Sequence, residues 1–430
     1  ARIFFFIGEI DEALHLYKLM VDKGDLSQAA SANFLCSLNY SSNFSQAQYL
    51  DYCKKINQKI KPKNLKDLID YEFDKNPDNL RIGFISPDFV EHSVTDFLFG
   101  TIKELKERNF KVYAFNLKKI SKLDSTSKEL TKTFDGWHDL AELSDVDAAN
   151  KIRKNKINIL IDLTGYFANN RFTIMKFKPA PIQIIWMGYT NTTGNEEIDY
   201  IVADPNLIKD NEKHLYSEKI LKLPKIWNCH SGIELNVEVE NLPYLTNNYI
   251  TFGCFNNSSK ISDAVIETWS EILLKINNSK LMMKAPSDDA EIAQKYILKK
   301  FNNYNIDSSR ILFSPRVKAR KDHYKMYNRI DISLDTFPYT GVTTSIESIW
   351  MGVPVLTLRG TNFVSRCGES LNSNLGMLEF IAKDKSDYIN KAITISQNKE
   401  KLSLIRKSLR KNVLNSPLFD MKNFGQDFPK

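Results

Sequence analysis

One stretch, residues 329–358, restricts the fold of this chain more than any other, because it predicts a strand, a loop, a helix and a second strand in immediate succession. Residues 330–335 alternate in polarity and begin with β-branched side chains, which is typical of a strand. The loop at 336–341 contains a proline and a glycine, and apolar residues then recur at helical spacing. A glycine and a proline end the helix before a second strand at 353–358. Such βαβ units are typical of α/β folds with parallel sheets.

The start of this helix is a candidate phosphate site. Thr343 or Thr344 can cap the helix, and Glu347 stands three residues after Thr344, as in a capping box. A helix N-terminus that follows a Gly/Thr loop directs backbone N–H groups at a ligand, which suits a phosphate. Glu347 could bond ribose hydroxyls from the first turn or merely complete the capping box. The alternative is an ordinary βαβ unit with a well-capped helix, since every α/β fold contains several.

Strands and helices alternate along most of the chain, which predicts doubly wound parallel sheets. In the first half we expect strands at 80–86, 110–115, 157–163, 182–186 and 200–203, with helices at 96–108 and 146–154. In the second half we expect strands at 249–255, 280–284, 311–313, 330–335 and 353–358, with helices at 263–274, 290–301, 323–328, 374–380, 386–397 and 399–414. These elements form two Rossmann-like domains, with the ligand in the crevice between them at the carboxyl ends of the strands.

A helical segment precedes the first predicted strand. Helices are expected at 7–23, 31–40 and 45–60, and the first resembles half of a tetratricopeptide unit. The chain starts without methionine, so we expect a longer helical array upstream. A turn at 76–79 and a polar linker at 240–249 suggest three parts: a helical segment at 1–75, an N-terminal Rossmann-like domain at 76–242 and a C-terminal nucleotide-sugar-binding domain at 243–430.

The composition argues against several classes of function. The net charge of +7 on 430 residues is modest, and no basic run is interleaved with aromatic residues, so no nucleic-acid partner is expected. No segment is apolar for long enough to span a membrane. Five scattered cysteines without metal spacing indicate reduced thiols in a cytoplasmic protein. The sequence has no G-x-G-x-x-G, P-loop or HExxH motif, which counts against nicotinamide cofactors, P-loop hydrolysis and a metal.

Four further side chains are candidates for chemistry, and each has a structural alternative. His92 follows the first strand of the first half, where it could orient a hydroxyl, accept its proton or lie on the surface. Lys260 occupies the equivalent loop of the second half and could neutralise a leaving diphosphate or be a solvated lysine. His323 could stack on a flat base or lie on a helix surface. Asp162 ends a buried strand and could act as an acid, orient a substrate or cap the following turn.

Taken together, these stretches resemble the catalytic region of the O-GlcNAc transferase/SPINDLY family of protein glycosyltransferases. The resemblance covers the chain from about residue 31 to near its end, in the family's order, and several motifs match jointly. The matching runs are RIGFISPDF at 81–89 with His92, INILIDLTG at 157–165, PAPIQ at 179–183, WMGY at 186–189 with TTG at 192–194, IDY at 198–200, FNN at 255–257 with KI at 260–261, DT at 335–336 with GVTT at 341–344, and SPLF at 416–419.

The resemblance implies a GT-B fold and an inverting transfer of a sugar from a nucleotide sugar to Ser or Thr of an acceptor protein, without a catalytic metal. It implies that His92 is the active-site histidine and that Lys260 stabilises the leaving diphosphate. Arg320 stands where the animal enzyme has a base-contacting lysine. The positions that match nucleotide contacts are Asn257, His323, Thr343, Thr344 and Glu347.

Some positions depart from the family pattern and bear on the donor sugar. Val342 replaces a histidine and Glu347 an aspartate of the animal transferase, and Tyr166-Phe167 stands where many bacterial relatives have His-Thr. The loops are closer to the SPINDLY branch, whose plant members use GDP-fucose. UDP-GlcNAc is the first expectation for the donor. The alternatives are protein O-fucosyl transfer from GDP-fucose, a processive or small-molecule glycosyltransferase, and a non-catalytic nucleotide-binding adaptor.

The resulting hypothesis assigns a part to each candidate. The diphosphate rests on the helix start at Gly341–Thr344, with Lys260 over it, the base against His323 and the ribose on Glu347. The acceptor hydroxyl enters from the side of His92 and attacks the anomeric carbon opposite the nucleotide. His92, Asp162 and a phosphate oxygen are the rival proton acceptors.

Overall fold

The computed structural model describes residues 1–24, 27–71, 73, 79–119, 124–285, 290–315 and 317–429. The chain divides into two compact units. We name the first the amino unit; it comprises Tyr17–Leu38, Asn43–Gly232 and Phe419–Lys430. The second, the carboxyl unit, comprises Ala1–Leu16, Asn39–Ser42 and Ile233–Leu418.

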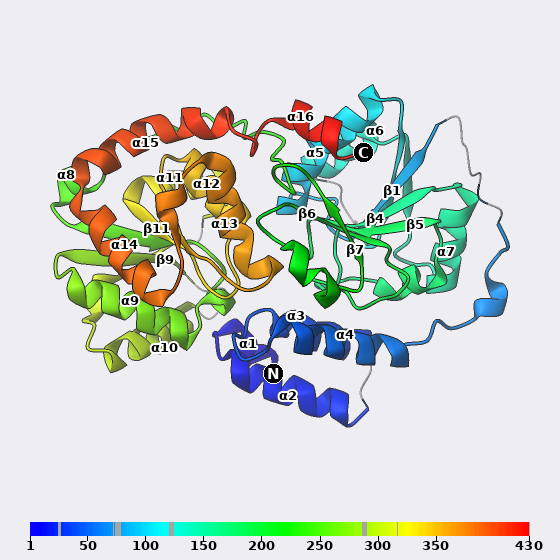
Figure 1. Ribbon diagram of the computed structural model, residues 1–430, viewed down its shortest axis with the longest axis horizontal. Coiled ribbons are helices and arrows are strands. Elements are labelled where there is room, and N and C mark those ends of the chain that lie inside the picture. The colour runs from blue at the N-terminus through cyan, green and yellow to red at the C-terminus, as the bar shows by residue number, and fades with distance from the viewer. Residues whose placement is uncertain are drawn as a thin grey trace. The chain divides into compact units, whose positions relative to one another are not determined.

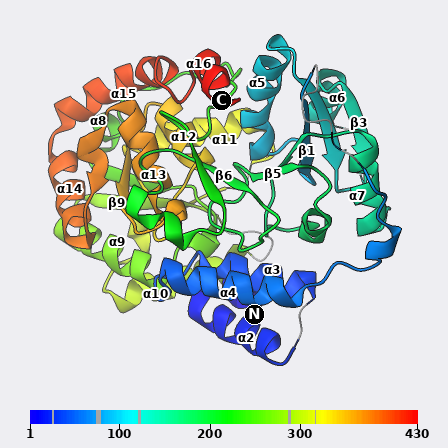
Figure 2. The same ribbon diagram turned by 45° about the vertical axis from the view of Figure 1, so that its right-hand side comes forward.

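The amino unit is built on a seven-stranded sheet in the order β3-β2-β1-β4-β5-β6-β7, in which all neighbours are parallel. The order reverses between β1 and β4, where Ile82 is opposite Ile159. Helices α5, α6 and α7 accompany this sheet (Figure 2). The elements are β1 Arg81–Ser86, α5 Ser93–Glu107, β2 Lys111–Asn116, α6 Ser125–Thr133, β3 Gly136–Asp139, α7 Asp145–Lys154, β4 Ile159–Asp162, β5 Ile182–Ile185, β6 Tyr200–Ala203 and β7 Lys219–Lys222.

The carboxyl unit repeats this plan with a six-stranded parallel sheet in the order β10-β9-β8-β11-β12-β13 and helices on both faces (Figure 1). Its core is apolar, and Phe252, Trp269 and Leu281 are completely buried. The elements are α8 Tyr244–Asn247, β8 Ile250–Cys254, α9 Asp263–Lys275, β9 Ser279–Lys284, α10 Ala290–Asn303, β10 Ile311–Ser314, α11 Arg320–Met326, β11 Ile332–Leu334, α12 Thr343–Trp350, β12 Val355–Leu358, α13 Phe363–Leu375, β13 Ile381–Ala382, α14 Lys385–Gln397 and α15 Lys399–Leu414. The two parallel sheets confirm the predicted doubly wound architecture.

The three predicted helices of the first residues are confirmed as α2 (Ile10–Asp22), α3 (Gln28–Leu38) and α4 (Gln46–Lys59), and a short α1 (Arg2–Phe6) precedes them. They do not form a separate third unit, because the division into two units assigns parts of this segment to each. The predicted boundary at 75/76 lies outside the described residues.

The boundary between the two units differs from the predicted one at 242/243, because the carboxyl unit already begins at Ile233. The intervening segment belongs to it through hydrogen bonds: Asn328 Oδ1 accepts the Glu240 N–H at 3.1 Å, and Asn328 Nδ2 donates to the Glu238 carbonyl at 2.9 Å. Leu242 is part of the buried core of this unit.

The last helix, α16 (Met421–Asp427), belongs to the amino unit rather than to the predicted C-terminal domain. It packs on α5, as both ribbon views show (Figures 1 and 2). The close approach depends on Gly100, where a Cβ would lie 2.7 Å from Met421 Cγ. The ring of Phe424 also stacks at 6.2 Å on that of Trp186.

The differences among the elements have local causes. The helix predicted at 374–380 is the end of α13 followed by the 3-10 turn η7 (Leu378–Phe380), so the predicted helix begins about three turns too late. The FVSRCGESLNSNL sequence of α13 is rich in Gly, Ser and Asn, which are poor helix formers. Capping by Asn362, whose side chain accepts the Ser365 N–H at 3.2 Å, and burial of residues 363–372 on every side of the helix compensate for this.

Candidate active site

The switch point of the carboxyl-unit sheet carries several predicted site residues. β8 and β11 are neighbours where the strand order reverses, and ligands of open α/β sheets bind at the carboxyl ends of such strands. Lys260 ends the 3-10 turn η4 (Ser258–Lys260), which follows β8. The loop from β11 to α12 contains Gly341 and ends at the helix start predicted to bind phosphate.

Asp335 organises the loop between β11 and α12. Its Oδ1 accepts the N–H groups of Thr336 at 3.0 Å and Gly341 at 2.7 Å. Its Oδ2 accepts the Thr357 hydroxyl at 2.8 Å, and Asn256 Nδ2 donates to Oδ1 at 3.2 Å. Burial raises the pKa of this carboxyl to about 6, while these hydrogen bonds oppose the rise. The sequence did not single out Asp335, which shapes the loop that presents Gly341.

Gly341 lies where the loop passes close to α12. A Cβ at this position would lie 2.7 Å from Ser345 Oγ, 2.8 Å from Thr344 Oγ1 and 2.9 Å from Asn256 Oδ1. The Thr344 hydroxyl donates a hydrogen bond to Asn256 Oδ1, which joins the start of α12 to the loop after β8. A side chain at 341 would therefore separate the two loops that meet here.

The predicted capping box of α12 is wrong. The N-cap residue is Val342, and among the described residues no side chain makes a capping hydrogen bond there. Glu347 instead receives the Tyr327 hydroxyl at 3.0 Å on Oε2, which also lies 3.1 Å from His323 Nε2. The Glu347 carboxylate thus bonds to Tyr327 and His323, which are distant in the sequence, and not to the backbone at the start of α12. The first N–H groups of α12 therefore lack a side-chain cap from the described residues, as an anion site requires.

An aromatic cluster adjoins Glu347. His323 lies on α11, and Tyr327 begins the 3-10 turn η6 (Tyr327–Arg329). The ring of Phe255 lies 4.9 Å from that of Tyr327 and 6.1 Å from that of His323. Arg320 begins α11, and its guanidinium carbon lies 5.8 Å from the ring centroid of Tyr324. The aromatic rings offer a face on which a base could stack, and the Glu347 carboxylate beside them could accept hydrogen bonds from ribose hydroxyls.

The surroundings of Lys260 lower the pKa of its ammonium group. Its Nζ donates to the Thr340 carbonyl at 2.9 Å and lies 4.1 Å from the ring centroid of Tyr339. Within the described part of the chain, no ion pair joins it to a carboxylate. Burial lowers the pKa of the half-buried ammonium to about 8, although the charge of Asp335 opposes this. Asn257 is exposed and caps the turn that carries Lys260, since its Oδ1 accepts the N–H two residues on at 3.2 Å.

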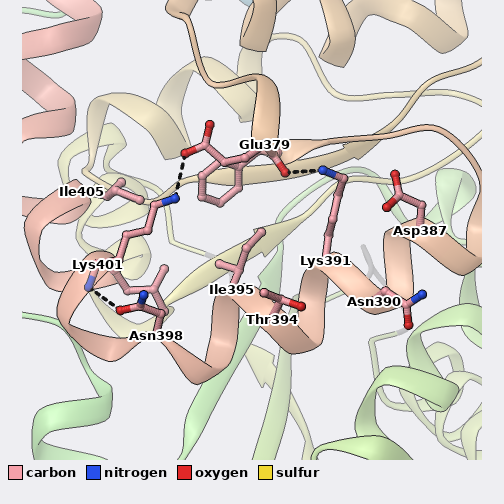
Figure 3. Close-up of a pocket in the computed structure, with 11 residues that line it drawn as sticks. Glu379, Asp387, Asn390, Lys391, Thr394, Ile395, Asn398, Lys401 and Ile405 are labelled. Atoms are coloured by element: carbon pink, nitrogen blue, oxygen red, sulfur yellow. Dashed lines mark hydrogen bonds and ion pairs between the residues drawn. The ribbon is translucent and has the colours of Figure 1, made fainter.

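A cavity of about 290 Å³ lies elsewhere in the carboxyl unit, at α14 and α15. Figure 3 shows Lys391 and Lys401 directed at Glu379. Lys401 Nζ lies 3.3 Å from Glu379 Oε1, and Lys391 Nζ donates to the Glu379 carbonyl at 2.9 Å. Its lining, as far as the described residues go, contains none of the predicted site residues, so we assign this cavity no part in the chemistry.

The amino unit contains His92 at the start of α5. Its Nδ1 accepts the Val94 N–H at 3.3 Å, so the imidazole is the N-cap of the helix. With Nδ1 as acceptor, a neutral imidazole carries its proton on Nε2. The residue is exposed. In the same loop, burial raises the pKa of Asp88, and electrostatic interactions with His92 and Lys118 oppose the rise.

Asp162 ends β4 and caps the turn that follows, which was the structural alternative considered from the sequence. Its Oδ1 accepts the Thr164 N–H at 2.8 Å, and its Oδ2 accepts the Gly165 N–H at 3.2 Å. Burial raises its pKa to about 6, against these two bonds. It is the counterpart of Asp335, which likewise fixes the loop after a switch-point strand of its own sheet.

The structure thus distributes the predicted residues over both units. His92 and Asp162 lie in the amino unit, and the carboxyl unit contains Asn257, Lys260, Arg320, His323, Gly341, Val342, Thr343, Thr344 and Glu347. Their functional roles stay predictions. The sequence missed Asn256, Tyr327, Asp335 and Tyr339. Signals existed for Asp335, which stands at the end of a strand as Asp162 does, and for Asn256, which lies in the FNN run that matches the family.

Comparison with known proteins identifies the family. The model of glycosyl transferase family 41 matches residues 51–232 and 234–428, which include every predicted site residue. The chain belongs to glycosyl transferase family 41. Its relatives in this family include proteins named probable UDP-N-acetylglucosamine–peptide N-acetylglucosaminyltransferase SPINDLY. The Petunia hybrida protein is 33% identical over 82% of this chain and 38% of its own length, and the Hordeum vulgare protein is 32% identical over 93% and 42%. The chain therefore spans about two fifths of the curated relatives it matches.

A solved structure of the family agrees with the fold. A mutant of the Thermobaculum terrenum O-GlcNAc transferase superposes with a TM-score of 0.91 at 25% identity, covering 99% of this chain and 81% of that one. This likeness and the two Rossmann-like units confirm the predicted GT-B fold class and the predicted family resemblance.

Two further findings concern metals and membranes. Among the described residues, no group of three or more His, Cys, Asp or Glu side chains is arranged to hold a metal ion. That the family 41 chain works without a metal stays a prediction. In the same part of the chain, no helix is both long and apolar enough to cross a membrane. None of the five cysteines, all of them described, forms a disulfide.

Proposed function

We propose that this chain transfers a sugar from a nucleotide sugar to Ser or Thr of an acceptor protein, with inversion and without a metal. UDP-GlcNAc is the proposed donor, because the names of the matched relatives specify UDP-N-acetylglucosamine and a peptide acceptor. GDP-fucose is the second candidate, because the loops are closer to the SPINDLY branch. Membership of family 41 supports the reaction class. The absence of disulfides among the cysteines supports cytoplasmic action.

One observation carries the proposal. At the switch point of the carboxyl-unit sheet, Lys260 and the uncapped start of α12 both adjoin the loop at 340–341, and the Glu347–His323 pair lies one turn further along the helix. An ammonium and open helix N–H groups suit a diphosphate. A carboxylate accepts ribose hydroxyls, and an aromatic cluster offers a face to a base.

The residues of this site would act mainly in the transition state. As the acceptor oxygen bonds to the anomeric carbon, the bond to the diphosphate breaks, negative charge grows on the leaving phosphate, and an oxygen of that phosphate takes the proton of the acceptor hydroxyl. Lys260 and the N–H groups of α12 would stabilise that charge more strongly than the charge of the bound donor. A pKa near 8 leaves Lys260 largely protonated at neutral pH, and an arriving diphosphate would favour its charged form further.

The amino-unit candidates differ in what they can do. Both carboxylate oxygens of Asp162 already accept backbone N–H groups, which favours a structural role. His92 presents a protonated Nε2 while its Nδ1 caps α5. A neutral imidazole in that state donates a hydrogen bond, so we assign His92 to orienting the acceptor oxygen rather than to removing its proton.

Calorimetric titration with UDP-GlcNAc, UDP-glucose and GDP-fucose tests the donor. We expect binding of UDP-GlcNAc, with Lys260→Ala as a variant that keeps most of the affinity. Tighter binding of GDP-fucose would instead support the fucosyl alternative. A labelled-donor assay with peptide and sugar acceptors then separates protein transfer from small-molecule transfer. Donor binding without transfer or hydrolysis would favour the non-catalytic adaptor.

A further inference from the structure

The ammonium of Lys260 lies over an aromatic ring and forms no ion pair with a carboxylate of the described residues. Its ammonium nitrogen lies 4.1 Å from the ring centroid of Tyr339, and the only hydrogen bond it makes to the described residues is to the Thr340 carbonyl at 2.9 Å. The negative face of an aromatic ring favours a cation, and the effect grows as water is excluded. Tyr339 therefore affects both the position and the protonation of the lysine.

The Tyr339 ring is itself packed against the N-terminal segment of the carboxyl unit. The ring centroid of Tyr40 lies 4.5 Å from that of Tyr339, with the planes tilted by 40°. Tyr40 is only 8% exposed, and the ring of Phe5 packs edge-on against it at 4.7 Å. A chain of rings thus connects Lys260 with the helical segment at residues 1–16 and 39–42.

The same helical segment contacts the backbone of the Lys260 turn. Ser258 Oγ, at the start of η4, donates to the Phe6 carbonyl at 3.1 Å. Gly8 has φ +83°, and a Cβ there would lie 2.6 Å from the Ile261 carbonyl oxygen. The helical segment therefore contacts this turn at its first residue, Ser258, and approaches closely the residue that follows it, Ile261.

An ion-pair cluster fixes this segment further along. Lys300 on α10 lies 2.6 Å from both Glu9 Oε1 and Asp263 Oδ1, and the Tyr296 hydroxyl also donates to Glu9. Glu9 is half-buried, which by itself would raise the pKa of its carboxyl, but the hydrogen bonds from Lys300 and Tyr296 lower that pKa overall. Residues 1–16 are thus held against α10 of the same unit by an ion pair and a hydrogen bond, in addition to the packing of the aromatic rings.

We propose that Tyr339 is a positioning residue for Lys260, and that Tyr40 makes the docking of the helical segment a requirement for sugar transfer. This inference rests on the proposed function of Lys260. The packed ring stabilises the ammonium over the donor site, and Tyr40 keeps the ring in place. Loss of either contact should impair the leaving-group step and leave donor binding largely intact.

The effect of the Tyr339 ring on the protonation of Lys260 can be measured, because the pKa of this lysine lies near neutral pH. Burial lowers the pKa of the lysine to about 8, while the charge of Asp335 and, when ionised, the thiols of Cys254 and Cys367 favour its protonated form. A pKa so close to neutral pH means that removing one favourable contact changes the charged fraction within the working range.

Competitive acetylation of the full chain, read by mass spectrometry as a function of pH, reports the protonation of Lys260 without any need for activity. In Tyr339→Leu we expect the apparent pKa of Lys260 to fall by about half a unit or more, because the cation–π contact is lost. Tyr339→Phe should restore it. Tyr249→Leu is the matched control, since Lys280 lies 4.8 Å over that ring in the same unit. An unchanged or raised pKa in Tyr339→Leu would overturn the role of the ring.

Steady-state kinetics and donor calorimetry test the second half of the proposal. Tyr339→Leu and Tyr40→Leu should each lower kcat about tenfold, a moderate loss of transition-state stabilisation, with the donor Kd nearly unchanged. Equal kcat in Tyr40→Leu and wild type would overturn the part of the helical segment. If wild type transfers no sugar from any donor, the proposed function fails, whereas the acetylation result still decides whether Tyr339 controls Lys260.

Discussion

His323 Nε2 and Glu347 Oε2 lie 3.1 Å apart, although 24 positions separate the two residues. The pair joins α11 to the first turns of α12, and the Tyr327 hydroxyl reaches the same carboxylate oxygen at 3.0 Å. Because the carboxylate is buried, losing either partner changes the geometry of the whole aromatic cluster. The proposed ribose and base contacts therefore depend on one another.

Glu347→Gln should weaken binding of the donor nucleotide about tenfold, because a neutral amide holds His323 and a ribose hydroxyl less strongly than a carboxylate does. Titration calorimetry with UDP measures the loss. Glu271→Gln is the control, since that carboxylate forms an exposed pair with Lys275 at 2.7 Å on α9. Unaltered UDP affinity in Glu347→Gln would remove Glu347 from the nucleotide site.

Lys260→Ala should lower kcat by about two orders of magnitude or more, with a much smaller change in donor Kd, because its charge acts on the leaving phosphate. Single-turnover transfer from labelled UDP-GlcNAc measures the chemical step. Lys280→Ala removes another lysine that lies over a tyrosine ring in this unit, and we expect it to behave as wild type. A fully active Lys260→Ala protein would contradict the assignment.

Two substitutions at position 92 separate helix capping from chemistry. Asparagine is a strong N-cap residue, so His92→Asn should keep α5 intact, whereas His92→Ala should lower the midpoint of thermal unfolding. Both should reduce transfer about a hundredfold if the imidazole orients the acceptor. Unfolding midpoint and transfer rate are measured on the same preparations. Full activity in His92→Asn would show that capping is the only task of His92.

Buried aspartates should make the stability of this protein depend on pH. Burial raises the pKa of Asp162 to about 6, so the folded state binds this proton more tightly than the unfolded state does. Its contribution to the free energy of unfolding is therefore present at acid pH and is lost as pH rises through about 6. Asp335 should behave in the same way in the carboxyl unit.

Asp162→Asn tests this linkage. Relative to wild type, its free energy of unfolding should rise by about 1 kcal/mol between pH 5 and pH 7.5, from the pKa shift and the linkage relation. Urea unfolding curves at the two pH values give the difference. Asp51→Asn, on the exposed face of α4, is the control. Parallel pH profiles for Asp162→Asn and wild type would contradict the raised pKa.

The sheets could be predicted because their central strands are continuous apolar runs. RIGFIS in β1 and ITFGC in β8 are buried along nearly their whole length, so composition alone indicates parallel strands. β3 (GWHD) and β7 (KILK) were missed, because short edge strands with exposed residues lack that pattern. The short edge strands and the strand order therefore needed the structure, whereas the central strands did not.

Site residues that stand in a loop directly after a strand could be predicted from the sequence. Contacts between side chains that are far apart in the sequence could not. Lys260 and His92 were found by position. The capping box at Thr344–Glu347 was a valid local pattern, but the sequence contains no sign that Tyr327 and His323 would take the carboxylate. Tyr339 was passed over as a loop residue, because only the fold brings Tyr40 to its ring.

The open start of α12 has a practical consequence for finding the donor. If a diphosphate binds the first N–H groups of α12, as proposed, a donor that binds the folded protein and not the unfolded chain will raise its stability by mass action. Dye-monitored melting against a panel of sugar nucleotides would rank candidates by the rise in Tm that each produces. Such a screen needs neither an acceptor protein nor turnover.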